Sequence, residues 1–214
     1  MKISVMLEQL SSGMLVSVEI FLLTLLFSLP LGLLVTFGRR SKNRILSSAV
    51  KFYIAIMRGT PLMLQLIVVY FAPFYVFGLT INGFRFPAII IAFSINYAAY
   101  FAEIYRGGIE AIPKGQYEAA QVLGYNRVQT FFRIIFPQVI RIILPSVTNE
   151  TITLVKDTSL AFVLAQAEMF TIAKQIAAKE ASVGPLMVAG VFYFVFNYVV
   201  AFIMERIEKK LNYY

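Results

Sequence analysis

The sequence predicts an all-α membrane protein of about five transmembrane helices, built as one domain over residues 1–214. Apolar residues make up 59% of the chain, charged residues only 14%, and the mean hydropathy is +0.77. A soluble domain is roughly half apolar and about a quarter charged. The apolar residues also form long continuous runs, without the alternation that is typical of transmembrane barrel strands. The chain is therefore expected to cross a bilayer as helices.

Five runs are long enough for this, since a spanning helix needs about 20 mostly apolar residues. The first is too long for the apolar core of a signal peptide, and no small-residue cleavage site follows it, so we expect it to remain as a span. The residues between the last two spans, 166–182, predict an amphipathic helix at the outer surface, either part of a gate, a seat for another protein or a plain linker. The predicted spans cover residues 12–38, 49–77, 86–106, 137–163 and 184–205.

The composition excludes several kinds of chemistry. The chain contains no Cys and no His, so disulfides, thiolate or imidazole metal sites and Ser-His-Asp catalysis are not expected. No catalytic residue and no metal site is predicted. Its net charge of +8 comes from basic residues that lie beside apolar runs, which indicates membrane orientation and not nucleic-acid binding.

The distribution of basic residues predicts the orientation of the chain. Twelve of them fall within residues 39–51, 106–133 and 206–210, which share one side of the bilayer, and four fall on the other side. Basic residues prefer the cytoplasmic side. We therefore expect the N-terminus outside, the C-terminus in the cytoplasm and the connection around Glu118 in the cytoplasm.

That connection carries the most informative motif. Glu118, Ala119 and Ala120 are followed by Gly124 and then, after nine residues, by Ile134-Ile135-Phe136-Pro137. Residues 116–123 predict a short helix, with Gly124 as a left-handed C-cap. Loop 113–137 resembles the cytoplasmic EAA loop of ABC importer permeases, except that Phe136 replaces a Leu. The alternative is an ordinary helix at the bilayer surface.

Further stretches between about residues 50 and 165 resemble permeases of the polar amino acid uptake family. They include Arg58-Gly59-Thr60-Pro61, Ala111-Ile112-Pro113-Lys114-Gly115-Gln116 and Lys156-Asp157-Thr158-Ser159-Leu160. The resemblance implies a type I importer of a prokaryotic cell membrane. Its expected partners are a second permease subunit, most simply an identical chain, an extracytoplasmic substrate-binding protein and separate ATPase subunits that bind ATP and Mg²⁺. This chain itself has no Gly-x4-Gly-Lys-Ser/Thr loop and is expected to hold no cofactor. Glu118, Ala119, Ala120 and Gly124 would then couple to the ATPase.

Polar residues inside the spans are the candidates for a transport path. A charge at mid-bilayer costs ~2.5–3.5 kcal/mol, so such residues usually face a cavity or a partner. On a helical period one polar face falls within residues 96–103 and another within 149–157. The alternative is internal neutralisation, with Arg58 paired to Glu103 and Lys156 to a neighbouring acid. The candidate substrate contacts are Arg58, Gly59, Thr60, Asn96, Tyr100, Glu103, Asn149, Glu150 and Asp157.

The second predicted span contains its own interruption. Gly59 and Pro61 break backbone hydrogen bonding, so we expect Thr60 to act as N-cap of a new half-helix that begins with Pro61. The positive end of such a half-helix, together with Arg58, suits a substrate carboxylate. A proline kink that serves packing alone is the alternative.

Acidic residues outnumber basic ones in the expected path, which favours a cationic amino acid, arginine, lysine or histidine, with glutamine second. An ion-coupled secondary transporter or a channel is the alternative function, in which the cytoplasmic loop would be passive. A membrane-embedded enzyme is disfavoured, because no His, Cys or paired acids face the cytoplasm. Any energy from ATP has to come from another polypeptide.

Overall fold

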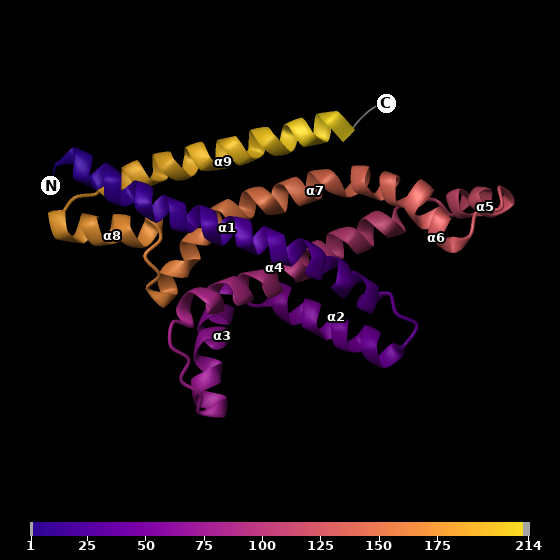
Figure 1. Ribbon diagram of the computed structural model, residues 1–214, viewed down its shortest axis with the longest axis horizontal. Coiled ribbons are helices and arrows are strands. Elements are labelled where there is room, and N and C mark those ends of the chain that lie inside the picture. Colours follow the sequence, from indigo (N-terminus) through magenta and orange to yellow (C-terminus); the bar gives the residue numbers. More distant parts are fainter. Residues whose placement is uncertain (1, 212–214) are drawn as a thin grey trace.

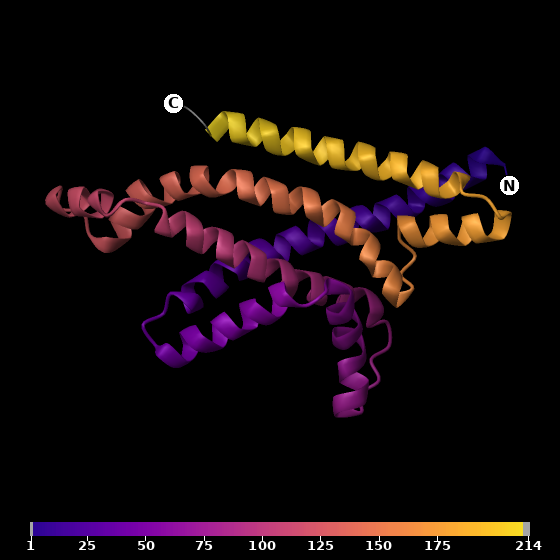
Figure 2. The same ribbon diagram turned by 180° about the vertical axis from the view of Figure 1, so that it is seen from behind.

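The computed structural model describes residues 2–211, which fold as helices joined by short connections (Figure 1). Within these residues there is no strand. Most long helices follow the longest axis of the molecule, whereas α3 projects to one side (Figures 1 and 2). The elements are α1 Ile3–Arg39, α2 Arg44–Gly59, α3 Leu62–Phe77, α4 Arg85–Glu110, α5 Lys114–Val122, α6 Arg127–Thr130, η1 Phe131–Ile135, α7 Phe136–Asp157, η2 Thr158–Leu164, α8 Met169–Glu180 and α9 Gly184–Leu211.

Four of these segments are long and apolar enough to cross a membrane. They are Ile3–Arg39, Arg85–Glu110, Arg127–Leu164 and Gly184–Leu211, and the pair α2 and α3 makes a fifth if the two are one broken span. The prediction of an all-α protein with about five spans is confirmed.

Helices α1 and α4 form the central pair of the fold. At Gly32 of α1 an added Cβ would lie 2.9 Å from the Cβ of Phe101 and 3.1 Å from the carbonyl oxygen of Ala98. The Thr36 hydroxyl donates to the carbonyl oxygen of Ala102 at 3.1 Å. Small residues let helix backbones approach closely where no water can drive association, so this contact fixes α1 against α4.

The second predicted span, 49–77, is interrupted as expected: α2 ends and α3 begins around Thr60 and Pro61, and the two helices meet at an angle of 114°. The finer prediction that Thr60 is the N-cap and Pro61 the first helical residue is wrong, because Thr60 ends α2 in extended conformation and Pro61 takes the N-cap position of α3. A residue before proline is pushed out of the helical region by contact with the proline ring, and Pro61 itself is extended, with a ψ of 132°, so α3 begins at Leu62.

The predicted span 137–163 begins earlier than expected. Asn126 accepts from the backbone N–H of Gln129 at 2.9 Å, and the Gln129 side chain accepts from the Asn126 N–H at 3.0 Å. This capping box starts a helical segment at Arg127. The segment then passes through a π-helical stretch, η1, before α7. Such stretches often occur at functional sites.

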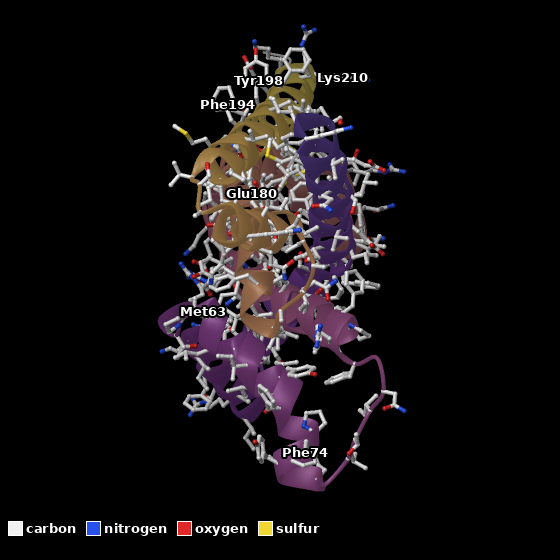
Figure 3. The ribbon with its side chains drawn as sticks, turned by 90° about the vertical axis from the view of Figure 1, so that its left-hand side faces the viewer. Met63, Phe74, Glu180, Phe194, Tyr198 and Lys210 are labelled. Carbon is white, nitrogen blue, oxygen red and sulfur yellow. The ribbon has the colours of Figure 1, made fainter. Side chains whose placement is uncertain are left out.

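Apart from the connections on either side of α3, the connections gather at two opposite ends of the molecule. Loop 40–43, α5, α6 and the last turns of α9 lie toward one end, and the start of α1 and α8 lie at the other (Figures 1 and 2). Residues 166–182 do form the expected extra helix, α8. Helix α9 lies on the outside of the fold, and Phe194 and Tyr198 are exposed on its outer side (Figure 3).

Candidate functional site

The break between α2 and α3 is held by a buried amide network. The Asn96 amide of α4 donates to the Met57 carbonyl oxygen at 3.0 Å and to the Gln65 side-chain oxygen at 2.9 Å. The Gln65 amide in turn donates to the Thr60 hydroxyl at 2.9 Å and to the Met57 carbonyl oxygen at 3.0 Å. Asn96 is only 4% exposed. Asn96 and Thr60 therefore brace the corner, while Gly59 is exposed at the end of α2.

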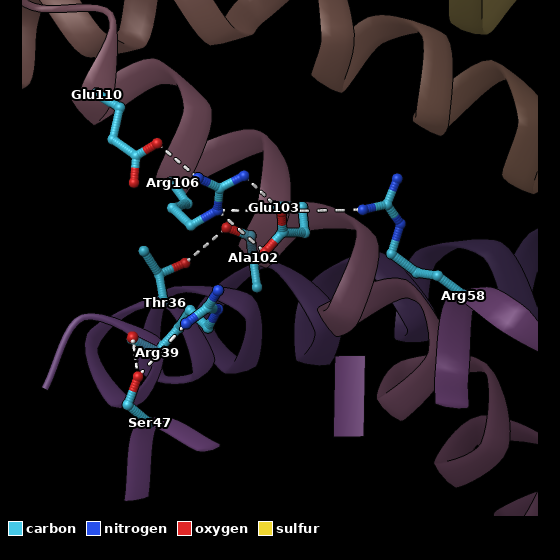
Figure 4. Close-up of polar contacts among 8 residues, drawn as sticks. All are labelled: Thr36, Arg39, Ser47, Arg58, Ala102, Glu103, Arg106 and Glu110. Atoms are coloured by element: carbon cyan, nitrogen blue, oxygen red, sulfur yellow. Dashed lines mark hydrogen bonds and ion pairs between the residues drawn. The ribbon is translucent and has the colours of Figure 1, made fainter. Parts of the chain in front are cut away.

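Arg58 lies beside this corner and reaches toward α4. Its guanidinium carbon is 5.2 Å from the centre of the Tyr100 ring, a cation–π distance. Its Nη1 is 4.0 Å from a carboxylate oxygen of Glu103, and its side chain is 44% exposed (Figure 4). The expected pairing of Arg58 with Glu103 is thus present, and part of the Arg58 side chain remains exposed.

The stronger partner of Glu103 is Arg106, one turn further along α4. Arg106 Nε donates to both carboxylate oxygens, at 3.0 and 3.1 Å, and Nη2 donates to one of them at 2.7 Å. Arg106 also reaches Glu110 at 2.5 Å (Figure 4). Bidentate pairs of this kind are the strong ones, so Glu103 is largely neutralised within its own helix.

The second polar face belongs to α7. The buried Tyr97 hydroxyl of α4 donates to Asp157 at 2.7 Å, which joins the two predicted faces. Glu150 is half-buried and lies within electrostatic range of both Arg58 and Asp157. In residues 2–211 neither Glu150 nor Asp157 has a basic partner within ion-pair distance. Asn149 is exposed.

The structure therefore brings most of the predicted residues to one region. Arg58, Tyr100, Glu103, Glu150 and Asp157 form a connected group, which we call the polar cluster. Sequence reasoning missed three of its supports, Gln65, Tyr97 and Arg106. Arg106 was recognisable from its spacing of three residues from Glu103, whereas Gln65 and Tyr97 gave no signal beyond being polar residues within apolar runs.

The short helix α5 lies at the far end of the molecule from α8. Gly124 has a φ of +76°, and the N–H groups of Gly124 and Tyr125 donate to the carbonyl oxygens of Gln121 and Ala120, both at 3.0 Å. This is a Schellman ending, which favours glycine, so the predicted C-cap is confirmed. Glu118 and Ala119 are exposed, whereas Ala120 is fully buried within the chain.

Apolar side chains stand out into solvent just before and after Gly124. Val122 is 88% exposed and Leu123 72%, and Val128 of α6 is also exposed. We call these three residues the apolar tip. The fold and these two regions define a class of protein: a polytopic membrane protein with a polar cluster between its helices and a short helix with exposed apolar residues at one end.

The chain belongs to the family described as the binding-protein-dependent transport system inner membrane component, whose model matches residues 28–213. It is 35% identical to the L-cystine transport system permease protein TcyB of Bacillus subtilis, over 96% of this chain and 87% of that protein. It is also 35% identical to the arginine transport system permease protein ArtQ of Bacillus subtilis, over 94% and 91%. A putative glutamine transport system permease protein GlnP of Rickettsia conorii is 34% identical, over 93% and 91%.

Solved structures agree with this assignment. The crystal structure of an amino acid ABC transporter with histidines contains a chain with a TM-score of 0.87 and 28% identity, over 98% of this chain and 99% of that one. The MetNI methionine ABC transporter, at 19% identity, shares the fold with a TM-score of 0.79. The chain is thus a multi-pass inner-membrane permease subunit of an amino acid ABC importer.

Proposed function

We propose that this chain forms the translocation path for a cationic amino acid, arginine, lysine or histidine, with glutamine as the second choice. The polar cluster is the observation that carries the proposal. Glu103 is held by Arg106, so in residues 2–211 Glu150 and Asp157 remain as acids without a basic partner at ion-pair distance, although Arg58 and Lys156 lie within electrostatic range of them. A cationic side chain would supply the missing charge, and Arg58 would meet the substrate carboxylate.

Relatives support a polar amino acid but differ in its identity. Their names include L-cystine, glutamine, arginine and nopaline transport. A similar solved chain belongs to an amino acid ABC transporter with histidines. The excess of acid in the polar cluster favours the cationic members of this range.

The energy for transport comes from a separate ATPase subunit that docks on α5. Glu118 and Ala119 present an exposed surface, and the apolar tip would be covered by the docked subunit. Ala120 does not contact the ATPase directly; it is buried and packs α5 against the rest of the chain. Two identical permease chains, two ATPase subunits and an extracytoplasmic substrate-binding protein make up the complete importer.

The orientation follows from the same surfaces. ATP is cytoplasmic, so α5, loop 40–43 and the C-terminal end of α9 face the cytoplasm, and α8 faces the binding protein outside. The basic residues at the α5 end support this orientation.

Uptake by reconstituted proteoliposomes tests the proposal. The permease, the ATPase and the binding protein are combined, and labelled arginine uptake is measured with unlabelled lysine, histidine, glutamine or cystine as competitors. We expect ATP-dependent uptake, with arginine, lysine or histidine as the strongest competitors. Uptake by the permease alone under an ion gradient would instead support the ion-coupled alternative.

Variants of the polar cluster separate path residues from structural ones. Glu150→Gln and Asp157→Asn keep size and shape but remove charge, so we expect uptake and substrate-stimulated ATP hydrolysis to fall roughly tenfold or more while the complex stays assembled. Glu19→Gln, which removes the charge of an exposed acid of α1 outside the polar cluster, is the control. Normal uptake kinetics in both acid variants would remove Glu150 and Asp157 from the path.

A further inference from the structure

A cavity of about 750 Å³ opens beside the docking helix, between the end of α1 and helices α4, α5 and α6. Its wall is mixed, with basic, aromatic and amide side chains. Arg40 comes from the end of α1, Arg127 from the start of α6, and Tyr117 and Gln121 from α5. The polar cluster does not use any of these residues.

Both arginines of this cavity are exposed and unpaired. Over residues 2–211 neither Arg40 nor Arg127 forms an ion pair with an acid or donates a side-chain hydrogen bond. By contrast, Arg106 of α4 forms ion pairs with both Glu103 and Glu110. Two free guanidinium groups at one cavity suit an anion with several oxygens, such as a phosphate group.

A second cavity, of about 320 Å³, borders the first, and the two share Ile109 and Phe131 in their walls. Its lining is almost wholly apolar, with Leu29 and Leu33 from α1 and Ile140 from α7. Phe131 begins the π-helical stretch η1, so the irregular turn of this segment lies where the two cavities meet.

The combined length of the cavities matches one leaflet of a bilayer. Leu29 stands 11 residues before Arg40 in α1, which is about 16 Å along a helix axis. One leaflet of hydrocarbon is about 15 Å thick, half of the roughly 30 Å core. The charged cavity lies at the basic end of the molecule and the apolar cavity at the depth of the spans.

We propose that the two cavities form one site for an anionic phospholipid, taken from the leaflet at the basic end of the molecule. The phosphate would lie between Arg40 and Arg127, and an acyl chain would fill the apolar cavity against Leu33 and Ile140. Basic pockets between spanning helices recognise acidic head groups in this way. The lipid would tie the end of α1 to α5 and α6, next to the docking surface.

Retention of lipid by the purified permease tests this site without any transport assay. The permease is placed in nanodiscs of neutral phosphatidylcholine with added phosphatidylglycerol. It is then released from the nanodiscs, and native mass spectrometry identifies the lipid that stays bound to it. Wild type should retain phosphatidylglycerol preferentially. The double variant Arg40→Gln, Arg127→Gln should lose roughly tenfold or more of this preference, whereas Lys42→Gln, Lys51→Gln, which changes two exposed basic residues outside the cavity, should keep it.

A neighbouring pair on α1 tests the acyl chain. Leu33→Trp fills the apolar cavity and should lower retention, while Leu34→Trp, at a position 65% exposed and outside the cavity, should not. Unchanged preference in the double arginine variant would overturn the site, and equal loss in both tryptophan variants would overturn the role of the apolar cavity.

Two competitors distinguish other occupants. Addition of the ATPase subunit should leave phosphatidylglycerol bound, and its release would make the cavity part of the ATPase seat. Millimolar inorganic phosphate should also leave it bound, because a free ion lacks the acyl chain. Displacement by phosphate alone would assign the site to a soluble anion and contradict the lipid.

Discussion

The corner between α2 and α3 and the apolar tip beside α5 are built on opposite principles. At the corner, Asn96, Gln65 and Thr60 hydrogen-bond to one another and to the backbone. At the tip, Val122 and Leu123 are 88% and 72% exposed. The corner is complete within one chain, whereas the tip leaves apolar surface uncovered, which is the property of an interaction surface. The difference indicates which candidate residues maintain structure and which serve binding.

The largest expected effect comes from placing charge on the apolar tip. The double variant Val122→Asp, Leu123→Asp should weaken binding of the ATPase subunit by roughly 30-fold or more, because even one buried apolar anchor at an interface is worth at least about 2 kcal/mol. Titration of labelled ATPase with the solubilised permease measures this. The melting temperature should stay unchanged, since neither residue packs inside the chain.

Lys42→Asp is the matched control, an exposed position at the same end of the molecule. Tight ATPase binding by the double variant would show that the tip is not a docking surface, and the contrast with the corner would then be lost.

The corner should respond in the opposite way. Asn96→Ala leaves the Gln65 side-chain oxygen without its donor and removes one of the two side-chain donors to the Met57 carbonyl oxygen. An unsatisfied buried polar group costs about 1–3 kcal/mol, so we expect lower stability in thermal unfolding and nearly normal ATPase binding. Asn149→Ala, at an exposed position, should leave the unfolding temperature unchanged. A stable Asn96→Ala protein that fails only in transport would make Asn96 a substrate contact instead.

Two glycines, Gly115 in the first turn of α5 and Gly124 just after its end, sharpen the comparison around one helix. Gly124→Ala forces a side chain into a φ of +76°, which costs about 1–2 kcal/mol. Gly115 lies inside α5 with open space where a Cβ would be, so Gly115→Ala should stabilise the helix by about 0.5–1 kcal/mol. Hydrogen exchange of the α5 amides measures both changes: exchange should be faster in Gly124→Ala and slower in Gly115→Ala. The same effect in both variants would contradict the Schellman ending.

Much of this architecture was predictable from the sequence. The apolar runs located the long helices, and α4 at Arg85–Glu110 differs little from the expected 86–106. Gly124 identified the end of α5, since few residues other than glycine adopt its backbone conformation. The charge distribution also placed loop 40–43 and α5 at the same end, as Figures 1 and 2 show.

The structural features that could not be predicted from the sequence depend on contacts between distant segments. Pro61 predicted a break, but the 114° angle is held by Asn96 and Gln65, which lie 31 residues apart. The burial of Ala120 depends on how α5 packs and not on its own spacing. The hydrogen bond between Tyr97 and Asp157 joins residues 60 positions apart, so no local pattern indicated it.

The smallest expected effect lies at the α8 end. Burial raises the pKa of the Glu168 carboxyl, which caps α8, although hydrogen bonds from the Phe170 and Thr171 N–H groups, the Thr171 hydroxyl and Tyr193 act to lower it. The uncharged Ser17 of α1 lies beside this group: its hydroxyl oxygen accepts from the Met169 N–H at 3.3 Å and is 3.5 Å from the Tyr193 hydroxyl. A raised folded pKa means that the contribution of Glu168 to stability is fullest below the ordinary glutamate pKa and declines as pH rises through the raised value.

The unfolding temperature should therefore fall as the pH rises from the ordinary glutamate pKa through the raised value, and Glu168→Gln should reduce this slope. The variant should not change ATPase binding at the apolar tip or the hydrogen bonds of the corner. A slope that persists in Glu168→Gln would assign the pH dependence to another group.

The most direct test of the account uses the absence of cysteine from this chain. Leu123→Cys introduces a single thiol at the apolar tip, which a membrane-impermeant maleimide can reach only from the side that the tip faces. In oriented membrane vesicles we predict labelling from the cytoplasmic side and protection when the ATPase subunit is bound. Labelling from the opposite side, or labelling that the ATPase does not change, would contradict the assignment of α5 as the helix through which ATP hydrolysis moves this permease.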